Sequence, residues 1–413
     1  MTAPPTADDL RRPPPQRWIN STVLGIVLAT LLSDFGHEMC TAVLPLYIER
    51  LALGAAGLGL IEGLADLAVS LSKLGGGVLG HRVQRKRPWA ASGYLITAVA
   101  TGAIGLARSL PWIVSLRVVA WVGRGYRGPL RDFLLADAVE KTHYGRAFGL
   151  ERAGDMLGAV SGPLVATLLL WGHVPLTTII LVASVPGIAA AAAMFFLVRE
   201  RPAPSAAEPA SPSGEEQPDS LERRLPRRFW LLLVGVLLFG LGDFSRTFII
   251  WLASGATGHE GRAAGTISLA VLLYTAHNLI SALAAYPLGH WGDRARKLPI
   301  LTAGYALGVL TNVLFAFSIG SLPMVAVATV LSGIYIAAEE TLEKATIAEL
   351  LPRRQRSLGL GILAGVNAVG DMVSSVVVGL LLDQGQGPWA FGLAAGCGAA
   401  GVLWMLVLVR RDR

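Results

Sequence analysis

The chain has 413 residues, of which 53% are hydrophobic and only 15% are charged. Because a soluble globular domain carries about 25% charged residues, this composition excludes a soluble domain and indicates a membrane protein. The formal net charge is +7, but the cations lie at the ends of apolar segments, so we expect no nucleic-acid partner.

Apolar segments long enough to cross a bilayer as helices recur along the whole chain. Residues 1–17 precede them and are rich in proline and polar residues, so we expect a disordered cytoplasmic tail. No small-residue cleavage site follows, and the first apolar segment is predicted to be an uncleaved span. Twelve spans are predicted, near residues 18–44, 57–79, 89–107, 111–138, 147–171, 175–198, 229–252, 264–289, 298–318, 322–348, 357–382 and 388–409.

One extended break interrupts this series at residues 199–227, which are rich in Pro, Ala, Ser and Glu. Such a segment cannot bury a core. We therefore predict a cytoplasmic linker between an N-terminal six-helix bundle at residues 18–198 and a C-terminal six-helix bundle at residues 228–413.

The topology follows from the placement of Lys and Arg. The termini and the even-numbered connections carry 24 of these residues, whereas the opposite side carries three, which are Arg50, Arg108 and Arg262. Since cytoplasmic loops of membrane proteins are enriched in Lys and Arg, both termini are predicted to be cytoplasmic. An even number of spans is then required, and twelve satisfies it.

The two halves are related in sequence at a constant offset of 212 residues. This offset matches Gly77 with Gly289, Arg82 with Arg294, Asp137 with Glu349, Gly149 with Gly361, and Gly158 with Gly370. Duplicated halves with a binding site between them are a common plan of transporters. We expect an all-α membrane protein built as two pseudo-symmetric six-helix bundles.

Ionisable residues occur inside the predicted spans, although each costs at least about 2.5–3.5 kcal/mol at mid-bilayer. They align in stripes on several helices, which predicts a polar cavity between the bundles. The candidates for the substrate cavity and for proton coupling are Asp34, His37, Glu38, Glu62, Asp66, Arg117, Arg124, Glu151, Asp155, Asp243, Arg246, Glu339 and Glu340.

Two interpretations of these charges stay open: a transport cavity, or salt bridges that hold the helices together. For proton coupling we single out Asp34, Glu38 and Glu62 as carriers and Arg117 as a modulating partner. Near the cytoplasmic ends, interfacial or gating pairs are favoured, formed by Arg127, Arg131, Asp132, Glu343 and Lys344.

A soft-metal site is conceivable at His37, Met39 and Cys40, because imidazole, thioether and thiol all suit copper. However, His37 and Cys40 share one helix face while Met39 points elsewhere, so we expect no metal site and no cofactor. No phosphate-binding loop, zinc signature or nucleophile elbow occurs in a supporting context. An enzyme is therefore not predicted.

The loop between the second and third spans carries a recognisable pattern, Gly77-Val78-Leu79-Gly80-His81-Arg82-Val83-Gln84-Arg85-Lys86. It resembles the G-x-L-x-D-R-x-G-R-R/K signature of the major facilitator superfamily, with His81 in place of the acid. The second half keeps the acid at Asp293, between Gly289 and Arg294. The resemblance implies the twelve-helix fold of that family. It also implies a cytoplasmic hinge and charge lock formed by Gly77, His81, Arg82, Arg85, Gly289, Asp293 and Arg294.

The fifth span carries Gly149, Gly158, Gly162 and Pro163, which resemble the antiporter motif of the same family. Ala166 and Thr167 replace the closing glycine pair. The resemblance implies export in exchange for protons, whereas the alternative is only a tight helix crossing that bends at the proline. Further motifs, such as Gly145-Arg146-Ala147-Phe148-Gly149, resemble a bacterial subgroup.

The sequence thus favours a proton-coupled exporter of a small polar or charged organic solute that works by alternating access. The alternatives are a proton-coupled importer of a nutrient, siderophore or metal complex, and, from another class, a membrane sensor that does not transport. We expect a monomer in the bacterial inner membrane, with the small-molecule substrate, protons and the lipid bilayer as its partners.

Overall fold

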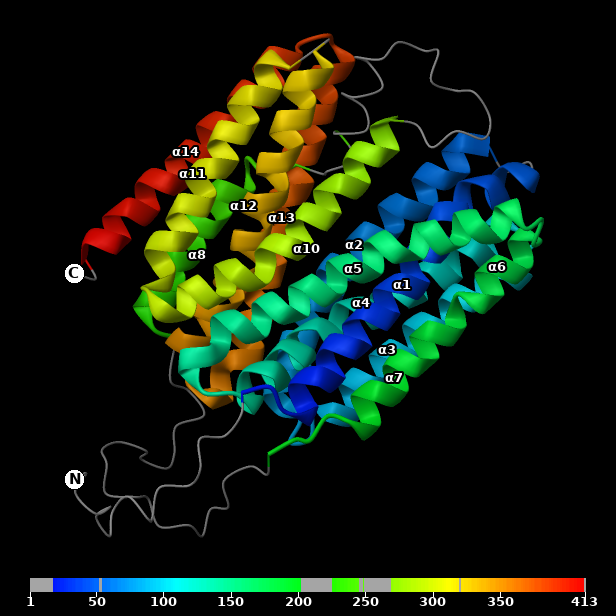
Figure 1. Ribbon diagram of the computed structural model, residues 1–413, viewed down its shortest axis with the longest axis horizontal. Coiled ribbons are helices and arrows are strands. Elements are labelled where there is room, and N and C mark those ends of the chain that lie inside the picture. Colours follow the sequence, from blue (N-terminus) through cyan, green and yellow to red (C-terminus); the bar gives the residue numbers. More distant parts are fainter. Residues whose placement is uncertain are drawn as a thin grey trace, which may run out of the picture.

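Residues 18–51, 54–201, 225–244, 248, 269–318 and 321–411 are described by the structure, a computed structural model of the chain. The regular elements in these residues are all helices (Figure 1). Residues 1–17 and 202–224, which contain the predicted tail and most of the predicted linker, lie outside the described residues.

The first half begins with α1 at Ser21–Arg50 and α2 at Gly54–Arg82, followed by α3 at Arg87–Ala103 with a 3-10 turn, η1, at Ile104–Leu106. The next elements are α4 at Leu110–Ala138, η2 at Lys141–His143 and α5 at Tyr144–Trp171. The half ends with α6 at Leu176–Val182 and α7 at Ser184–Phe196. The α6–α7 pair fills one predicted span and breaks at Ala183, because Pro186 cannot donate a backbone hydrogen bond to Val182.

The second half contains α8 at Arg227–Gly240, α10 at Leu269–Arg294, α11 at Lys297–Phe317, α12 at Leu322–Leu350, α13 at Arg353–Asp383 and α14 at Gly387–Arg411. Eight of the described helical segments are long and apolar enough to cross a membrane. Each of the twelve predicted spans contains at least one described helical segment. The prediction of an all-α membrane fold is confirmed.

Large apolar side chains cover the outside of the helix bundles. Leu168 is 60% exposed, Phe196 is 76% exposed and Phe317 is 70% exposed. A soluble monomer rarely exposes apolar surface on this scale, whereas lipid tails would cover it at no cost. These faces therefore fit the lipid bilayer.

Small residues allow the closest helix crossings. Gly158 and Gly162 of α5 pack so tightly on α1 that a Cβ at either position would meet the backbone oxygen of Leu31 or Phe35. Gly149, at the other end of the same motif, packs instead on Ala285 of α10. The glycines predicted in the fifth span therefore serve both the core of the first half and the contact between the halves.

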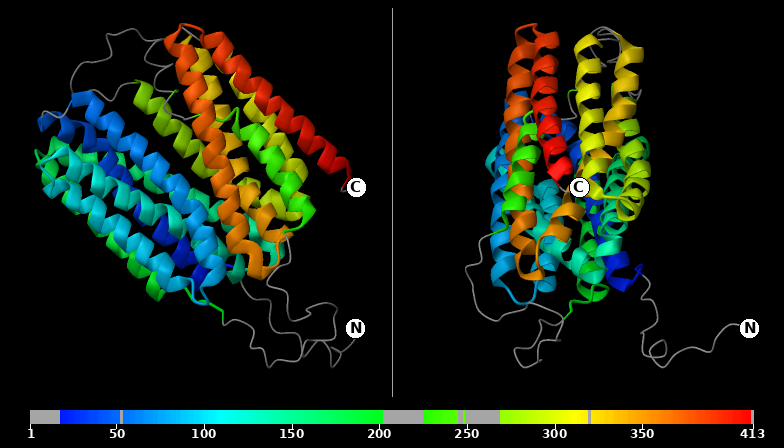
Figure 2. Two further views of the ribbon diagram at one scale, coloured as in Figure 1. Left: turned by 180° about the vertical axis from the view of Figure 1, so that it is seen from behind. Right: turned by 90° about the vertical axis from the view of Figure 1, so that its left-hand side faces the viewer.

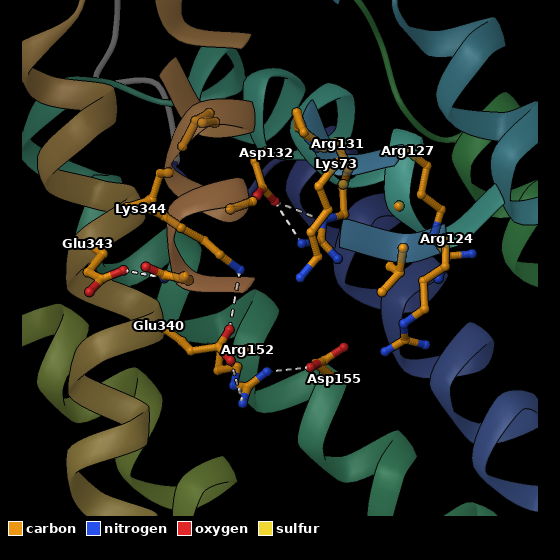
Figure 3. A pocket seen from close by; sticks show the side chains of 18 of the residues that line it. Lys73, Arg124, Arg127, Arg131, Asp132, Arg152, Asp155, Glu340, Glu343 and Lys344 are labelled. Atoms are coloured by element: carbon orange, nitrogen blue, oxygen red, sulfur yellow. Dashed lines mark hydrogen bonds and ion pairs between the residues drawn. The ribbon is translucent and has the colours of Figure 1, made fainter. Parts of the chain in front are cut away.

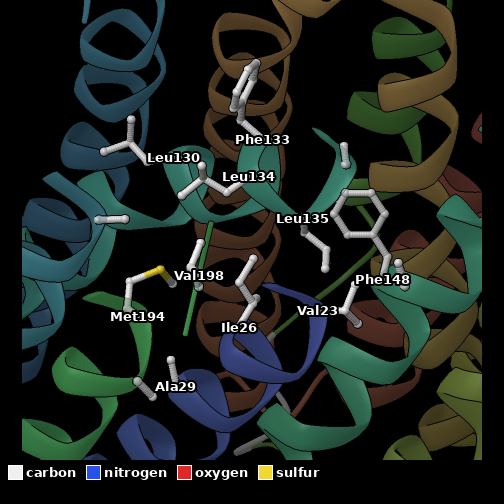
Figure 4. Close-up of a cluster of buried hydrophobic side chains, with 14 of the residues drawn as sticks. Val23, Ile26, Ala29, Leu130, Phe133, Leu134, Leu135, Phe148, Met194 and Val198 are labelled. Atoms are coloured by element: carbon white, nitrogen blue, oxygen red, sulfur yellow. The ribbon is translucent and has the colours of Figure 1, made fainter. Parts of the chain in front are cut away.

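The two halves meet at one end and diverge at the other (Figures 1 and 2). The two most extensive crossings between them are those of α5 with α10 and of α2 with α13. At the joined end, α4 residues Leu130, Leu134 and Leu135 pack on Val23 of α1 and Phe148 of α5 in a buried cluster (Figure 4). The joined end is the one predicted to face the cytoplasm, so the chain adopts an outward-facing arrangement under that prediction.

Candidate functional site

A cavity of about 300 Å³ lies between the two halves, above the end at which they meet. Helices α1, α2, α4 and α5 line one side, and α12, α13 and the residues after α8 line the other (Figure 3). Its charged lining residues are Asp34, Lys73, Arg124, Arg127, Arg131, Asp132, Glu151, Arg152, Asp155, Asp243, Glu339, Glu340, Glu343, Lys344 and Asp371.

The first-half wall contains a bidentate ion pair between α1 and α4. Arg124 donates from Nη1 to Asp34 Oδ1 at 2.7 Å and from Nη2 to Asp34 Oδ2 at 2.9 Å. Asp34 is 2% exposed. Such paired, planar hydrogen bonds are stronger than neutral ones and fix the geometry of both groups. Arg124, rather than the predicted Arg117, is the partner of Asp34.

Arg117 instead reaches deeper into the first half. It is 1% exposed, donates from Nη2 to Thr41 Oγ1 at 3.2 Å, and lies over the Trp121 ring at 5.5 Å from its centroid. His37 contacts the edge of the same ring, with centroids 4.9 Å apart. Arg117, His37 and the nearby Glu38 do not line the cavity.

Closer to the joined end, a second cluster of charges links α4 with α5. Arg131 contacts Glu151 at 2.8 Å and Asp132 at 2.7 Å. Arg127 forms no ion pair with an acid of the described residues; it donates to Ser33 Oγ at 2.7 Å and lies 3.8 Å over the Tyr94 ring. These contacts lie within the first half and stabilise that bundle.

Arg152 of α5 connects the halves across the cavity. Its Nη1 contacts Asp155 at 2.7 Å within α5, and its Nη2 contacts Glu340 of α12 at 3.1 Å (Figure 3). Lys344 lies 3.6 Å from the same Glu340. Glu340 therefore receives cations from both halves, which is the arrangement expected of a contact that breaks when the halves rock.

In the second-half wall, two buried acids accept hydrogen bonds from neutral groups. Glu343, 1% exposed, accepts a hydrogen bond from the Tyr305 hydroxyl of α11 and another from Asn367 Nδ2 of α13 at 2.7 Å. Asp243 accepts a hydrogen bond from the Tyr335 hydroxyl at 2.9 Å. Hydroxyl and amide groups thus contact both acids, whereas the sequence favoured an interfacial or gating pair for Glu343.

The two walls carry opposite excess charge. Among the described lining residues, the first-half wall has five cations and four acids, whereas the second-half wall has Lys344 and five acids. A cavity with low-dielectric walls concentrates the resulting field. The cavity is therefore acidic overall, with its excess on the second half.

Charged residues also hold the joined end together. Asp293, whose side chain is fully buried, accepts hydrogen bonds from Gly145 N at 2.7 Å, Arg146 N at 2.9 Å and Arg146 Nε at 3.1 Å. This carboxylate therefore caps the start of α5, where the helix dipole favours an anion. Gly289, one turn earlier on α10, lies directly against Gly145.

The corresponding loop of the first half makes a weaker contact. His81 Nδ1 lies 3.1 Å from the Arg354 oxygen. A different acid joins the halves here, because Arg353 Nε and Nη2 donate to the two carboxylate oxygens of Asp137 at 2.5 and 2.8 Å. Gly77 packs on Gly361 at the α2–α13 crossing.

The cavity brings together most of the residues predicted for it: Asp34, Arg124, Glu151, Asp155, Asp243, Glu339 and Glu340. The predicted gating residues Arg131, Glu343 and Lys344 line it as well. Arg82, Arg85 and Arg294 are exposed at the joined end. Arg246 and the side chains of Glu62 and Asp66 lie outside the described residues.

Sequence reasoning did not identify the tyrosines that contact the second-half acids, or the pair of Asp137 with Arg353. The repeat gave the only signal for the latter, because it matches Asp137 with Glu349. Within the described residues, no group of three or more His, Cys, Asp or Glu side chains is placed to hold a metal ion. Met39 and Cys40 instead belong to a buried apolar cluster.

Comparisons with known proteins cover almost the whole chain. The model of the Major Facilitator Superfamily matches residues 26–271 and 247–413. An uncharacterised protein of Mycobacterium tuberculosis is 30% identical over 381 residues, which are 90% of this chain and 88% of the relative. An uncharacterised MFS-type transporter of Methanocaldococcus jannaschii is 25% identical over 366 residues, which are 88% of this chain and 89% of the relative.

Solved structures share the fold. The human organic anion transporter MFSD10 superposes with a TM-score of 0.73 at 15% identity, covering 95% of this chain and 100% of that one. The MFS transporter FucP in the outward conformation gives a TM-score of 0.71 at 14% identity, covering 93% of this chain and 98% of that one.

Proposed function

The chain belongs to the major facilitator superfamily, and on that premise we propose that it is a secondary active transporter that exports a small polar or charged organic solute in exchange for protons. The observation that carries this proposal is the cavity of about 300 Å³ that both halves line with ionisable side chains. Buried charges of this density are costly in a membrane and are expected along a transport pathway.

The excess of acids favours a solute that carries an amine, either cationic or zwitterionic. Among the described residues of the second-half wall, five acids accompany one cation, Lys344. A protonated amine and protons would then compete for the same carboxylates. Mutually exclusive binding of solute and proton is the requirement for exchange, and it agrees with the partial antiporter motif in α5.

Proton-coupled import is a second candidate, and one contact favours it. Asp34 is 2% exposed, and its carboxylate is paired with the guanidinium of Arg124. An anionic solute that bound Arg124 would break this pair. An acid that loses its cation in a buried site binds a proton more readily. Solute and proton would then bind together, as symport requires, with Asp34, Glu38 and Glu62 as the candidate carriers.

A ligand screen followed by a flux assay distinguishes these two candidates. Thermal stabilisation of the purified protein would first be measured with matched cationic, zwitterionic and anionic solutes, since a ligand that binds only the folded state raises its stability. Flux of the stabilising solutes into proteoliposomes would then be measured under imposed pH gradients. We expect amines to stabilise the protein and an acidic lumen to drive their uptake.

The control for this assay is a quaternary ammonium analogue together with protein-free liposomes, because a weak base can accumulate passively in an acidic lumen. Uptake driven by acid outside the vesicles would instead support import. Equal flux with and without a pH gradient of either sign would exclude proton coupling.

A further inference from the structure

Glu343 differs from the other acids of the cavity in the contacts that it makes. It lies in α12, is 1% exposed, and accepts hydrogen bonds from Tyr305 and Asn367, both neutral groups. Among the described residues, no Lys, Arg or His forms an ion pair with it. A buried carboxylate that is not neutralised by a cation is strongly disfavoured unless it binds a proton.

The charged groups around Glu343 come from several elements. On its own helix, Glu339 and Glu340 lie about one turn away, and Lys344 is the next residue along the chain. Asp243 after α8 is a further acid that acts on Glu343 electrostatically. Two cations of the cavity, Lys344 and Arg152 of α5, contact Glu340, at 3.6 and 3.1 Å. Acids therefore dominate the surroundings of Glu343.

The contacts of Glu343 suit both protonation states. An ionised carboxylate accepts from the Tyr305 hydroxyl and from Asn367 Nδ2, as the described geometry has it. A protonated carboxyl can donate to the Tyr305 oxygen, because a phenol both donates and accepts. Asn367 also lines the cavity, so a proton can enter and leave from that space.

We propose that Glu343 is the proton carrier of the exchange cycle, and that its protonation weakens the contact between α12 and α5. This inference rests on the proposed exchange function. When Glu343 is ionised, its charge adds to that of Glu340, one helical turn away, and strengthens the attraction to Arg152 of the other half. Protonation removes this attraction and favours separation of the halves at the joined end.

Protonation of Glu343 favours opening toward the cytoplasm, which is the direction that export requires. In the outward-facing arrangement the ionised Glu343 holds the joined end closed until a proton from outside neutralises it. The protonated protein then opens toward the cytoplasm, releases the proton there and binds the solute. A ligand or proton shifts a conformational equilibrium only when it binds the two states with different affinity, and the contact through Glu340 supplies that difference.

The first test is infrared pH-difference spectroscopy of the full chain in phosphatidylcholine and phosphatidylglycerol vesicles. We expect a carbonyl band of a protonated carboxyl group in the wild type that is absent in Glu343→Gln and retained in the control Glu340→Gln. In Tyr305→Phe the band should move to higher frequency, because the carboxyl group loses a hydrogen bond. If Glu343→Gln does not fold, the Tyr305→Phe shift decides. Retention of the full band in a folded Glu343→Gln overturns the proposal, as does an unshifted band in Tyr305→Phe.

The second test measures the conformational equilibrium with spin labels at Ser109→Cys and Gln386→Cys, two exposed positions at the diverging end of different halves. Cys40 and Cys397 are replaced by Ala in this background. Acidification should shift the wild type toward the shorter distance, whereas Glu343→Gln should favour the shorter distance at every pH. The same pH response in both proteins overturns the proposal.

Failure of this inference and failure of the proposed exchange give different results. If a pH gradient drives equal flux through the wild type and Glu343→Gln, another group carries the proton while exchange stands. If no gradient drives flux but the infrared band and the pH-dependent distance depend on Glu343, exchange fails while the titration of Glu343 stands.

Discussion

Two buried acids of the cavity, Asp34 in the first half and Glu343 in the second, have different kinds of partner. In the first half, cations and acids contact each other directly, as in the bidentate pair of Arg124 with Asp34 at 2.7 and 2.9 Å. In the second half, Glu343 accepts from Tyr305 and Asn367, and Asp243 accepts from Tyr335. A directly paired charge has little reason to titrate, whereas an acid among hydroxyl and amide groups can. The duplication has thus given one half suited to a fixed structure and one suited to a change of charge.

The two halves also differ from each other in the acids that they contribute to the joined end. Apart from Glu340 in the cavity, Asp293 of the second half and Asp137 of the first half each contact the other half, but these two acids do not occupy equivalent positions. Asp293 belongs to the hinge loop of the second half, and its equivalent in the first half is His81. Asp137 of α4 pairs with Arg353, whereas its equivalent Glu349 contacts Lys297 within its own half at 2.9 Å. The loss of an acid at one repeated position is thus matched by a bridging acid at another.

The largest effect is expected when the pair in the first half is broken. Arg124→Leu leaves the buried Asp34 without its cation, and removal of one partner of a buried ion pair costs about 3–5 kcal/mol. Glu343→Gln, the matched change in the second half, should cost less than about 1 kcal/mol because an amide can keep hydrogen bonds with both neighbours. Unfolding in detergent, followed by denaturant or heat, measures both. Equal losses would contradict the distinction between the halves.

The second prediction compares the two bridging acids. Asp293→Asn should weaken the closed joined end by about 2 kcal/mol, because a buried charge-assisted contact with the start of α5 is lost. Asp137→Asn should have a smaller effect, since its partner Arg353 is 31% exposed and solvent weakens the pair. The labelled pair Ser109→Cys and Gln386→Cys reports both changes as a shift toward the shorter distance. A larger shift for Asp137→Asn would reverse the assignment of the main lock.

The third prediction concerns the glycine crossings that join the halves. Gly289→Ala places a Cβ against the Gly145 carbonyl oxygen, and such overpacking costs about 1 kcal/mol or more. At Gly77 the nearest atom to an added Cβ is the Gly361 Cα at 2.9 Å, so Gly77→Ala should open the joined end less. The same spin-label distance measures the difference. Equal opening by both variants would mean that the crossings contribute alike.

Much of the fold could be predicted because each contributing signal is local. Twenty-residue apolar segments, the Lys and Arg bias and the 212-residue offset need no knowledge of packing. The break between α6 and α7 was not predicted, since Pro186 lies three residues after Ala183 and hydropathy does not change there. The bounds of α1 and α2 extend past the apolar stretches to Arg50 and Arg82, because charged residues can continue a helix beyond the hydrocarbon.

The partners of the charged residues were harder to predict, although one further step would have found some of them. Asp34 lies 13 residues from the start of α1, and Arg124 lies 14 residues from the end of the antiparallel α4. At 1.5 Å per residue, both lie roughly 20 Å from the joined end. Arg117 lies about 10 Å further along α4, at the level of Thr41. The distance of each residue from the joined end, considered together with the helix face on which it lies, thus selects the observed pairs.

Contacts of neutral groups with acids are beyond that method. Nothing in the spacing of Tyr305, Asn367 or Tyr335 distinguishes them from tyrosines and asparagines that face elsewhere. Their contacts depend on the rotation of α11, α12 and α13 about their own axes, which packing of the whole half determines. The acids of the second half could therefore be predicted to share a cavity, but their partners could not.

The smallest predicted effect is a gain in the stability of the closed joined end, obtained by restoring the missing acid of the first hinge loop. His81 lies beside the first turn of α13, at Arg354, and Pro352 provides that helix with no side-chain cap. In His81→Asp a carboxylate would face a helix start, as Asp293 faces α5, which contributes about 0.3–1 kcal/mol. We expect a longer spin-label distance and partial rescue of Asp293→Asn in the double variant. His81→Asn, which adds no charge, is the matched control. If His81→Asp opened the joined end, the two hinge loops would not be equivalent in position. The contact of Asp137 with Arg353 would then be a separate feature of the first half and would not replace the lost acid.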